Sequence, residues 1–260
     1  MSRSHPRPPV DPTLLNAGAT DAMWTNLGDW QASRDYGSAA RALATHVGAA
    51  AALRAGDVVV DYACGFGDSL RLWVDHFGVR RVVGVEPDPA VCETVRARVA
   101  RWGLQDRVSV VSSRAEALPP RAAAADVTAV VSVDAAYHFR SRLAWWRMLG
   151  ADLPPGARIA CSDLCIANGR HVGVLGRSLA RMMGIPTENL VPTSVLQQAL
   201  REVMRSDVRL EPCGRSVLDG FAAHAPARGL QLRIAKASIR ALRRRGLLEY
   251  AILSATVAAT

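Results

Sequence analysis

The stretch VVVDYACGFGDS, residues 58–69, decides the fold of this chain. Its opening valines form an apolar run without polar alternation, which predicts a strand buried on both faces of a parallel sheet. The run ends at Asp61 and leads into a turn that contains Gly65 and Gly67. In open α/β sheets, ligands bind beyond the carboxyl ends of strands, where glycines let the backbone approach and the next helix offers free N–H groups. Such a turn can also serve packing alone, so both interpretations stay open at this point.

The next apolar run, RVVGVEPDP (residues 81–89), supports a ligand at that turn. It ends at Glu86, 21 residues after Gly65, and an acid at about this spacing can bind both hydroxyls of a cofactor ribose. Glu86 could instead only help to begin the next helix, for which Asp88 is a suitable N-cap. A dinucleotide is disfavoured because Leu70 takes the third glycine position of its fingerprint, and no phosphate-binding P-loop motif is present. We therefore expect a nucleoside cofactor.

The order of apolar patterns predicts a single α/β domain. Short β-branched runs alternate with helical patterns, as in parallel strands joined by crossover helices. After the second strand, Val91 and Val95 share one helical face, and Arg98 is expected to point elsewhere. Segment 165–195 is longer than a minimal connection needs, so we expect a lid there. The strands are expected at residues 58–62, 81–86, 107–112, 126–133, 157–163, 206–212 and 247–257.

Composition excludes several classes of protein. Half of the 260 residues are hydrophobic, but no apolar run reaches the ~18 residues that a membrane span requires. Residues 1–20 have prolines and charges without an apolar signal region, which favours a disordered tail ahead of one domain over 21–260. The five cysteines are odd in number and scattered, which is typical of a cytoplasmic protein without a disulfide framework. Packing is favoured over a metal site for Cys161 and Cys165.

The net charge of +9 is concentrated near the end of the chain. Residues 201–245 hold eleven basic and four acidic side chains, which gives +7. Within them a helix is expected, with Leu230, Ile234, Ile239 and Leu242 toward an apolar side and with Arg233, Lys236, Arg240 and Arg244 displayed largely away from it. Its basic face is either an ordinary solvated surface or a site for RNA or DNA phosphates. No appended nucleic-acid-binding domain is apparent, so nucleic acid is not the expected partner.

Five segments carry a family resemblance: VVVDYACGFGD, VVGVEPDP, VVSSRAEALP, ADVTAVVSVDAAYHF and LPPGARIACSDL. Together they resemble class I methyltransferases that use S-adenosylmethionine, in the small-molecule branch that acts on natural products and lipids, over about residues 24–164. The resemblance implies a Rossmann-like, seven-stranded, mostly parallel sheet with an antiparallel last strand and helices on both faces. It also implies an N-terminal helical cap over residues 21–55. In this branch, aromatic residues of the cap close over the cofactor and the substrate.

The resemblance assigns S-adenosylmethionine to the glycine turn. Asp61 would lie near its methionine part, Glu86 would bind the ribose, and the segment after the third strand would bind adenine. Asp134, at the end of the fourth strand, could bind the cofactor's amino group or cap the following helix. The expected cofactor-binding residues are Tyr36, Asp61, Ala63, Gly65, Gly67, Glu86, Pro87, Ala115, Glu116 and Asp134.

Three positions depart from the family pattern. Ala63 replaces the usual first glycine and adds only a methyl group if its φ is negative. Arg114 stands where an adenine-binding acid is common, and its guanidinium can only donate hydrogen bonds. Adenine is therefore expected to bind Glu116 or backbone groups. Ala157 replaces the second glycine of the fifth element.

The acceptor site is less defined. Because the sulfonium methyl group is already activated, the protein must mainly hold an acceptor in line and exclude water. His138 could be a general base or only position the substrate, and only one of His138 and its neighbour Tyr137 is expected to face the ligand. Aromatic rings such as Trp30 could surround the cationic sulfur of the cofactor, or they could pack the N-terminal cap onto the core. The lid side chains could contact the substrate or belong to the core. The expected catalytic residues are His138 and Tyr137, and the expected substrate-binding residues are Trp24, Trp30, His138, Leu175, Leu179 and Met182.

These observations predict an enzyme that moves a methyl group to oxygen, nitrogen or activated carbon of an apolar or aromatic small molecule, as in secondary metabolism. An RNA or other nucleic-acid methyltransferase is one alternative. A methyltransferase-like binding protein without catalysis is another. No metal or membrane partner is expected, and the oligomeric state stays open, with a homodimer as one option.

Overall fold

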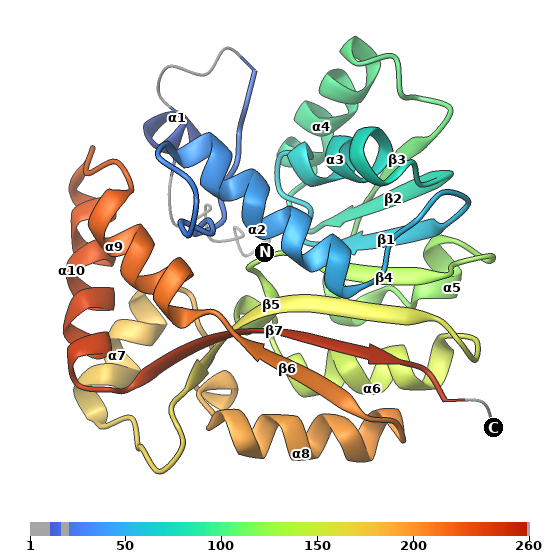
Figure 1. Cartoon of the computed structure of the whole chain (residues 1–260). Helices are drawn as coiled ribbons and strands as arrows, with labels where there is room; N and C mark the ends of the chain where they lie inside the picture. Colours follow the sequence, from blue (N-terminus) through green and yellow to red (C-terminus); the bar gives the residue numbers. More distant parts are fainter. Residues whose placement is uncertain (1–10, 17–20, 259–260) are drawn as a thin grey trace, which may run out of the picture.

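The computed structural model describes residues 11–16 and 21–258 and contains one seven-stranded sheet in the order β3-β2-β1-β4-β5-β7-β6 (Figure 1). The pairs β3–β2, β2–β1, β1–β4 and β4–β5 are parallel, and β7 runs antiparallel to both β5 and β6. The fold predicted from the sequence, including the antiparallel last strand, is confirmed. The strands are β1 (Val58–Tyr62), β2 (Arg81–Glu86), β3 (Val108–Ser112), β4 (Ala129–Ser132), β5 (Arg158–Ile166), β6 (Val208–Pro212) and β7 (Leu248–Thr256).

Strand β1 lies at the centre of the parallel part, between β2 and β4, and all five of its residues are buried. This accounts for its apolar run, because both faces of a central parallel strand are covered by helices. The chain order reverses between β1 and β4, so their carboxyl ends form the topological switch point at which α/β sheets bind ligands. The glycine turn leaves β1 at this point.

Helices cover both faces of the sheet (Figure 1). The side with α2 (Tyr36–Ala50), α3 (Asp68–Phe77) and α4 (Pro89–Arg101) is filled by residues such as Trp73. The other side, with α5 (Pro120–Ala123), α6 (Arg142–Asp152) and α8 (Thr193–Met204), is filled by Trp145 and Trp146. The remaining helices are α1 (Pro12–Leu15), α7 (Val174–Met182), α9 (Gly220–His224) and α10 (Leu230–Arg244), with short turns η1 (Ala115–Ala117), η2 (Ala136–His138), η3 (Thr187–Asn189) and η4 (Arg215–Asp219).

Two expected boundaries differ in the structure. The lid was expected to begin at residue 165, but β5 continues to Ile166 because Cys165 and Ile166 pair with Glu249 and Leu248 of the long strand β7. Residues 11–16 were expected in the disordered tail, yet Asp11 caps the short helix α1, and Leu15 is buried in the core. The rest of the expected tail, residues 1–10 and 17–20, lies outside the described residues.

The basic helix α10 packs with a face that only partly matches the expected one, since Ile239 is buried and Leu242 packs on the core as expected. Leu230 and Ile234 are 66% and 42% exposed, whereas Lys236 is buried and donates a hydrogen bond from Nζ to the carbonyl of Ala225. The buried positions, which include Leu232 and Ile239 as well, follow helical spacing and contact α9 and β7. The expectation for Lys236 was wrong because a lysine can bury its aliphatic stem when its ammonium group reaches a carbonyl at the end of a neighbouring helix.

Candidate cofactor site

The glycine turn has a left-handed backbone at three positions. The φ angles are +57° at Ala63, +53° at Gly65 and +86° at Gly67. At Gly67 a Cβ atom would lie 2.8 Å from Cγ1 of Val95, so this glycine also allows α4 to pack closely against the turn. The condition under which Ala63 would add only a methyl group, a negative φ, is therefore not met. The amide groups of Ala63 and Cys64 both donate to the carbonyl of Val85, which bends the chain sharply after β1.

Replacing Ala63 by glycine is expected to stabilise the protein by about 0.5–1 kcal/mol, because a left-handed alanine costs ~1–2 kcal/mol and glycine loses part of that gain to unfolded-chain entropy. Urea unfolding measures this change. Ala52, which is exposed and has a φ of +47°, is the matched control away from the cavity. A63G and A52G should stabilise similarly. Destabilisation by A63G would show that the methyl group contributes packing that outweighs its strain.

Asp61 presents one carboxylate oxygen without a partner. Its Oδ2 accepts hydrogen bonds from Ser69 Oγ at 2.7 Å and from Trp73 Nε1 at 2.8 Å. Its Oδ1 is buried and has no hydrogen-bond partner in the described structure. Burial raises the pKa of Asp61 to about 6, and the two hydrogen bonds partly oppose this increase. A buried acceptor of this kind is costly unless a donor reaches it, and an ammonium group is a suitable donor.

Glu86 closes the other side of the turn. Its Oε2 accepts a hydrogen bond from the amide of Gly65 at 3.2 Å, and its Oε1 accepts one from the amide of Asp88 at the same distance. Burial raises the pKa of Glu86 to about 7. Asp88 itself accepts from Ala90 N as the N-cap of α4, so the cap is supplied by Asp88 rather than Glu86. The carboxylate at the end of β2 is thus left for a ligand beside the turn.

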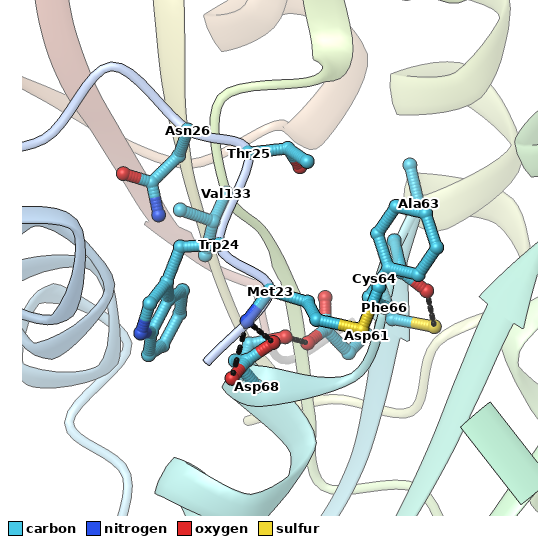
Figure 2. A pocket seen from close by; sticks show the side chains of 12 residues that line it. Met23, Trp24, Thr25, Asn26, Asp61, Ala63, Cys64, Phe66, Asp68 and Val133 are labelled. Atoms are coloured by element: carbon cyan, nitrogen blue, oxygen red, sulfur yellow. Dashed lines mark hydrogen bonds between the residues drawn. The ribbon is translucent and has the colours of Figure 1, made fainter. Parts of the chain in front are cut away.

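A strap formed by residues 21–30 covers the turn, and its Met23–Asn26 segment roofs a small cavity (Figure 2). The cavity measures about 30 Å³, whereas pockets for ligands of cofactor size span roughly 300–1,000 Å³. This cavity alone is therefore too small to hold a whole nucleoside. The cavity is lined by Met23, Trp24, Thr25, Asn26, Asp61, Ala63, Cys64, Gly65, Phe66, Asp68, Ser69 and Val133.

Four expected site residues, Trp24, Asp61, Ala63 and Gly65, line this cavity. Gly67 lies in the turn and Glu86 beside it without lining the cavity, and Trp30 and Tyr36 do not line it either. Trp30 is buried, donates from Nε1 to the carbonyl of Leu27 and packs on Tyr36 and on His224 of α9. Tyr36 is buried as well, and its hydroxyl donates to the carbonyl of Asn26 at 2.7 Å. Both rings therefore staple the strap to the core, which is the second of the two interpretations given for them.

Asp134 anchors the strap instead of capping a helix. Its Oδ2 accepts from the amide of Leu27 at 2.7 Å, and its Oδ1 accepts from the hydroxyls of Tyr137 at 2.8 Å and Tyr250 at 2.6 Å. The capping interpretation is wrong, because the N-cap of α6 is Ser141, whose hydroxyl accepts from the amide of Ala144. The carboxylate has three donors in place and does not line the cavity, so in this structure it holds the strap. Burial raises the pKa of Asp134 to about 6.

Tyr137 and His138 both belong to the turn η2, and their side chains lie in different surroundings. Tyr137 is buried, and its hydroxyl is committed to Asp134, so the expectation that it acts on substrate is wrong. His138 is half-buried, and its Nδ1 lies 3.2 Å from the carbonyl of Gly184, in the segment that was expected to form a lid. Because a carbonyl only accepts, Nδ1 carries the proton and Nε2 keeps a free lone pair. Burial lowers the pKa of His138, which favours this neutral form.

The remaining expected residues lie away from the cavity. Met182 is 74% exposed on the outer side of α7, so it does not line a substrate site in this state, and Leu179 is partly buried. The side chain of Leu175 lies outside the described residues. Pro87 follows β2, and Ala115 is buried at the start of η1. The Oε1 of Glu116 accepts from the amide of Ser141, so this acid is already used in joining η1 to α6.

Sequence reasoning missed the roof residues Met23, Thr25 and Asn26, and it misplaced Arg98. The last is 1% exposed and forms a bidentate ion pair with Asp68, at 2.8 and 2.9 Å. The Asp68 carboxylate also accepts from the amide of Met23. The one sequence signal for this ion pair was Asp68, the acid that ends the GFGD segment. An acid at a helix N-terminus that lies beside a helix rich in arginine can attract a buried arginine as its partner.

The comparisons with known proteins agree with this geometry. Residues 59–151 match a methyltransferase domain family. The chain is 29% identical over 208 residues to erythromycin 3''-O-methyltransferase of Saccharopolyspora erythraea, covering 77% of this chain and 67% of that enzyme. The structure resembles geranyl diphosphate C-methyltransferase from Streptomyces coelicolor A3(2), with a TM-score of 0.76, 16% identity and coverage of 96% and 93% of the two chains. It also resembles the [4+2]-cyclase SpnF, with a TM-score of 0.71, 18% identity and coverage of 95% and 92%.

Residues 59–151 thus form a methyltransferase domain, and the chain is similar to a known methyltransferase over most of its length. The residues at the turn fit S-adenosylmethionine as the cofactor. The free oxygen of Asp61 suits an ammonium group, the glycines allow close approach of the backbone, and the carboxylate of Glu86 suits a pair of ribose hydroxyls. Among the described residues, no helix is long and apolar enough to span a membrane.

Cofactor affinity is expected to increase with pH. Asp61 and Glu86, with pKa values of about 6 and about 7, are partly protonated near neutrality, whereas an ammonium group and ribose hydroxyls bind best to ionised carboxylates. Binding should lower both pKa values and release protons. The affinity should be about tenfold weaker at ~pH 6 than at ~pH 8, because most Glu86 carboxyls are protonated at the lower pH. Calorimetry in buffers of different ionisation enthalpy counts the protons, and an affinity independent of pH would contradict this assignment.

Proposed function

We propose that the chain methylates an oxygen, nitrogen or activated carbon atom of an apolar or aromatic small molecule in secondary metabolism. The observation that supports this most is the similarity over 208 residues to an enzyme named for O-methylation of erythromycin. A structural neighbour is named for C-methylation of geranyl diphosphate, so the fold is compatible with more than one acceptor atom. An oxygen acceptor is the first choice, because the sequence relative carries that chemistry.

We assign cofactor binding to Gly65, Asp61 and Glu86. The amide groups of the turn and the oxygen of Asp61 that has no partner would hold the methionine part, and Glu86 would hold the ribose. When bound, S-adenosylmethionine supplies an activated methyl group on a sulfonium centre. The protein's own contribution is to orient the acceptor toward that group and to exclude water with the roof formed by the strap.

His138 is the proposed general base. It lies after the carboxyl end of β4, near the cofactor turn in the topology, and its neutral Nε2 is available to accept a proton from a hydroxyl acceptor. The bond from Nδ1 to the Gly184 carbonyl fixes the ring against the lid. This contact would make the orientation of the base depend on the position of the lid.

The basic face of α10 gives little support to a nucleic-acid substrate. Lys236 donates to the carbonyl of Ala225, and Arg240 donates to that of Ala222. Arg243 forms two hydrogen bonds with the carboxylate of Asp219 and a third with the carbonyl of Leu248. These cations are used to join α10 to α9 and β7. Binding of phosphates would have to compete with those contacts.

The proposal is tested with methyl-labelled S-adenosylmethionine. The protein is incubated with an extract of the producing cells, and the products are separated into small-molecule, protein and nucleic-acid fractions. We expect the label in a small molecule that partitions into organic solvent, in a bond that mass spectrometry assigns to a methoxy group. Label confined to RNA or DNA would overturn the proposal in favour of the nucleic-acid alternative. Binding of the cofactor without label in any fraction would favour a non-catalytic role.

A further inference from the structure

Arg98 lies beside the cofactor turn but lines no part of its cavity. It projects from α4 and is 1% exposed, and its guanidinium is shared among three neighbouring groups. Both terminal nitrogens bind the carboxylate of Asp68, at 2.8 and 2.9 Å. Nη1 also donates to the carbonyl of Phe66 in the turn, and Nη2 donates to the carbonyl of Asp21 in the strap. A single side chain therefore joins α4, the glycine turn and the first residue of the strap.

The same ion pair holds the roof of the cavity. The amide of Met23 donates to both carboxylate oxygens of Asp68, at 3.2 and 3.3 Å, and Figure 2 shows Met23 directly against that carboxylate. The indole of Trp102 packs on the guanidinium of Arg98, 4.6 Å from ring centroid to Cζ, and donates from Nε1 to the carboxylate of Asp21 at 2.9 Å. The strap is thus fastened at Asp21 and Met23 by contacts that converge on Arg98.

The strap has a second fastening at its other end, which does not involve Arg98. There the amide of Leu27 donates to Asp134, and the hydroxyl of Tyr36 donates to the carbonyl of Asn26. The residues between the two fastenings form the roof. Because the cavity of about 30 Å³ is far smaller than a nucleoside needs, we expect at least one fastening to open when the cofactor enters.

We propose that Arg98 is a positioning residue for cofactor binding, which closes the strap at residues 21–23 over the bound cofactor and so sets how long the cofactor stays. The inference rests on the cofactor site proposed above. Arginine suits this position because its planar fork can bind a carboxylate with two nitrogens and still donate to two carbonyls. A lysine can keep the charge opposite Asp68 but cannot make all of these contacts at once.

The test compares R98K and R98M with R101M as the matched control. Arg101 lies on the same helix, is exposed and reaches Asp21 only at 3.6 Å. The dissociation rate of S-adenosylmethionine is measured by displacement in stopped flow, and thermal unfolding shows which variants are folded. We expect dissociation to be about tenfold faster in R98K and in R98M if it folds, and nearly unchanged in R101M. An unchanged rate in a folded Arg98 variant would reduce Arg98 to a structural ion pair and overturn the inference.

Amide hydrogen exchange of the unmodified protein provides a second measurement that requires no variant to fold. The amide of Met23 should exchange by local opening, faster than the amides of β1, and added cofactor should slow its exchange. Exchange of Met23 only through global unfolding, with no effect of cofactor, would contradict the inference. Failure of the unmodified protein to bind S-adenosylmethionine would instead contradict the proposed site, so the two failures can be told apart.

Discussion

Replacing Glu86 by glutamine is expected to weaken S-adenosylmethionine binding by about 100-fold, because two charge-assisted hydrogen bonds to the ribose are lost or weakened. The fold should survive the change. Burial already raises the pKa of Glu86 to about 7, so a neutral side chain of the same shape resembles a form that the protein holds near neutrality. Calorimetric titration with S-adenosylmethionine measures the change in affinity.

E93Q is the matched control for this variant. Glu93 is exposed on α4, so its replacement removes the same charge without touching the turn. E93Q should bind the cofactor with an affinity within about twofold of the unmodified protein, because an exposed charge that does not contact the turn contributes little. If E86Q bound as tightly as E93Q, the ribose would have another partner, and the assignment of Glu86 would be wrong.

Replacing His138 by alanine is expected to lower the turnover of a hydroxyl acceptor by about 100-fold, the lower end of what a general base contributes. The affinity for S-adenosylmethionine should stay within about twofold, because His138 does not line the cofactor cavity. The pKa of His138 is lowered by burial, so turnover should reach its plateau at a lower pH than an ordinary histidine would give. Single-turnover rates with the acceptor identified by labelling measure both effects.

H138Q separates the two roles considered for this residue. Glutamine can still hydrogen-bond an acceptor or the carbonyl of Gly184, but it cannot take a proton at neutral pH. If His138 is the base, H138Q should be nearly as slow as H138A. Recovery of turnover in H138Q would show that the residue only positions the substrate. H76A, at an exposed site at the end of α3, should leave turnover unchanged.

The sheet and the turn could be predicted because their signals are local. The continuous valine run before Asp61 predicts a buried strand, and the structure buries all of β1. Strands β1 and β2 begin and end where the sequence predicts. Strand β4 is shorter than expected, since only Ala129–Ser132 pair with their neighbours, and periodicity alone does not show where pairing stops.

The roof of the site could not be predicted, because its contacts join residues far apart in the sequence. The bond from Leu27 to Asp134 spans 107 residues, and the bond from Tyr250 to the same carboxylate spans 116. No local pattern specifies which buried donors meet one acid. The same holds for Arg98, whose place in a helix rich in exposed arginines predicts a solvated side chain, although Asp68 and two carbonyls make its burial possible.

The sequence predicted the position of the aromatic residues ahead of the sheet, but it predicted the role of only some of them. Their concentration in the cap is real, and Trp24 lines the cavity. Trp30 instead packs against Gly220, where a Cβ atom would lie 2.5 Å from the Cβ of Trp30. The packing of Trp30 therefore depends on a glycine about 190 residues away in the sequence. The spacing of aromatic residues within the cap carries no information about this contact.

The central claim is that the turn at Gly65 and the carboxylate of Glu86 hold S-adenosylmethionine beneath the strap. A crystal structure of the chain with S-adenosylhomocysteine tests it most directly. We predict ribose hydroxyls within hydrogen-bond distance of Glu86, the amino group beside Asp61, and Met23–Asn26 displaced outward from their present positions. Density for the nucleoside at any other place, with the strap unmoved over the turn, would contradict the account.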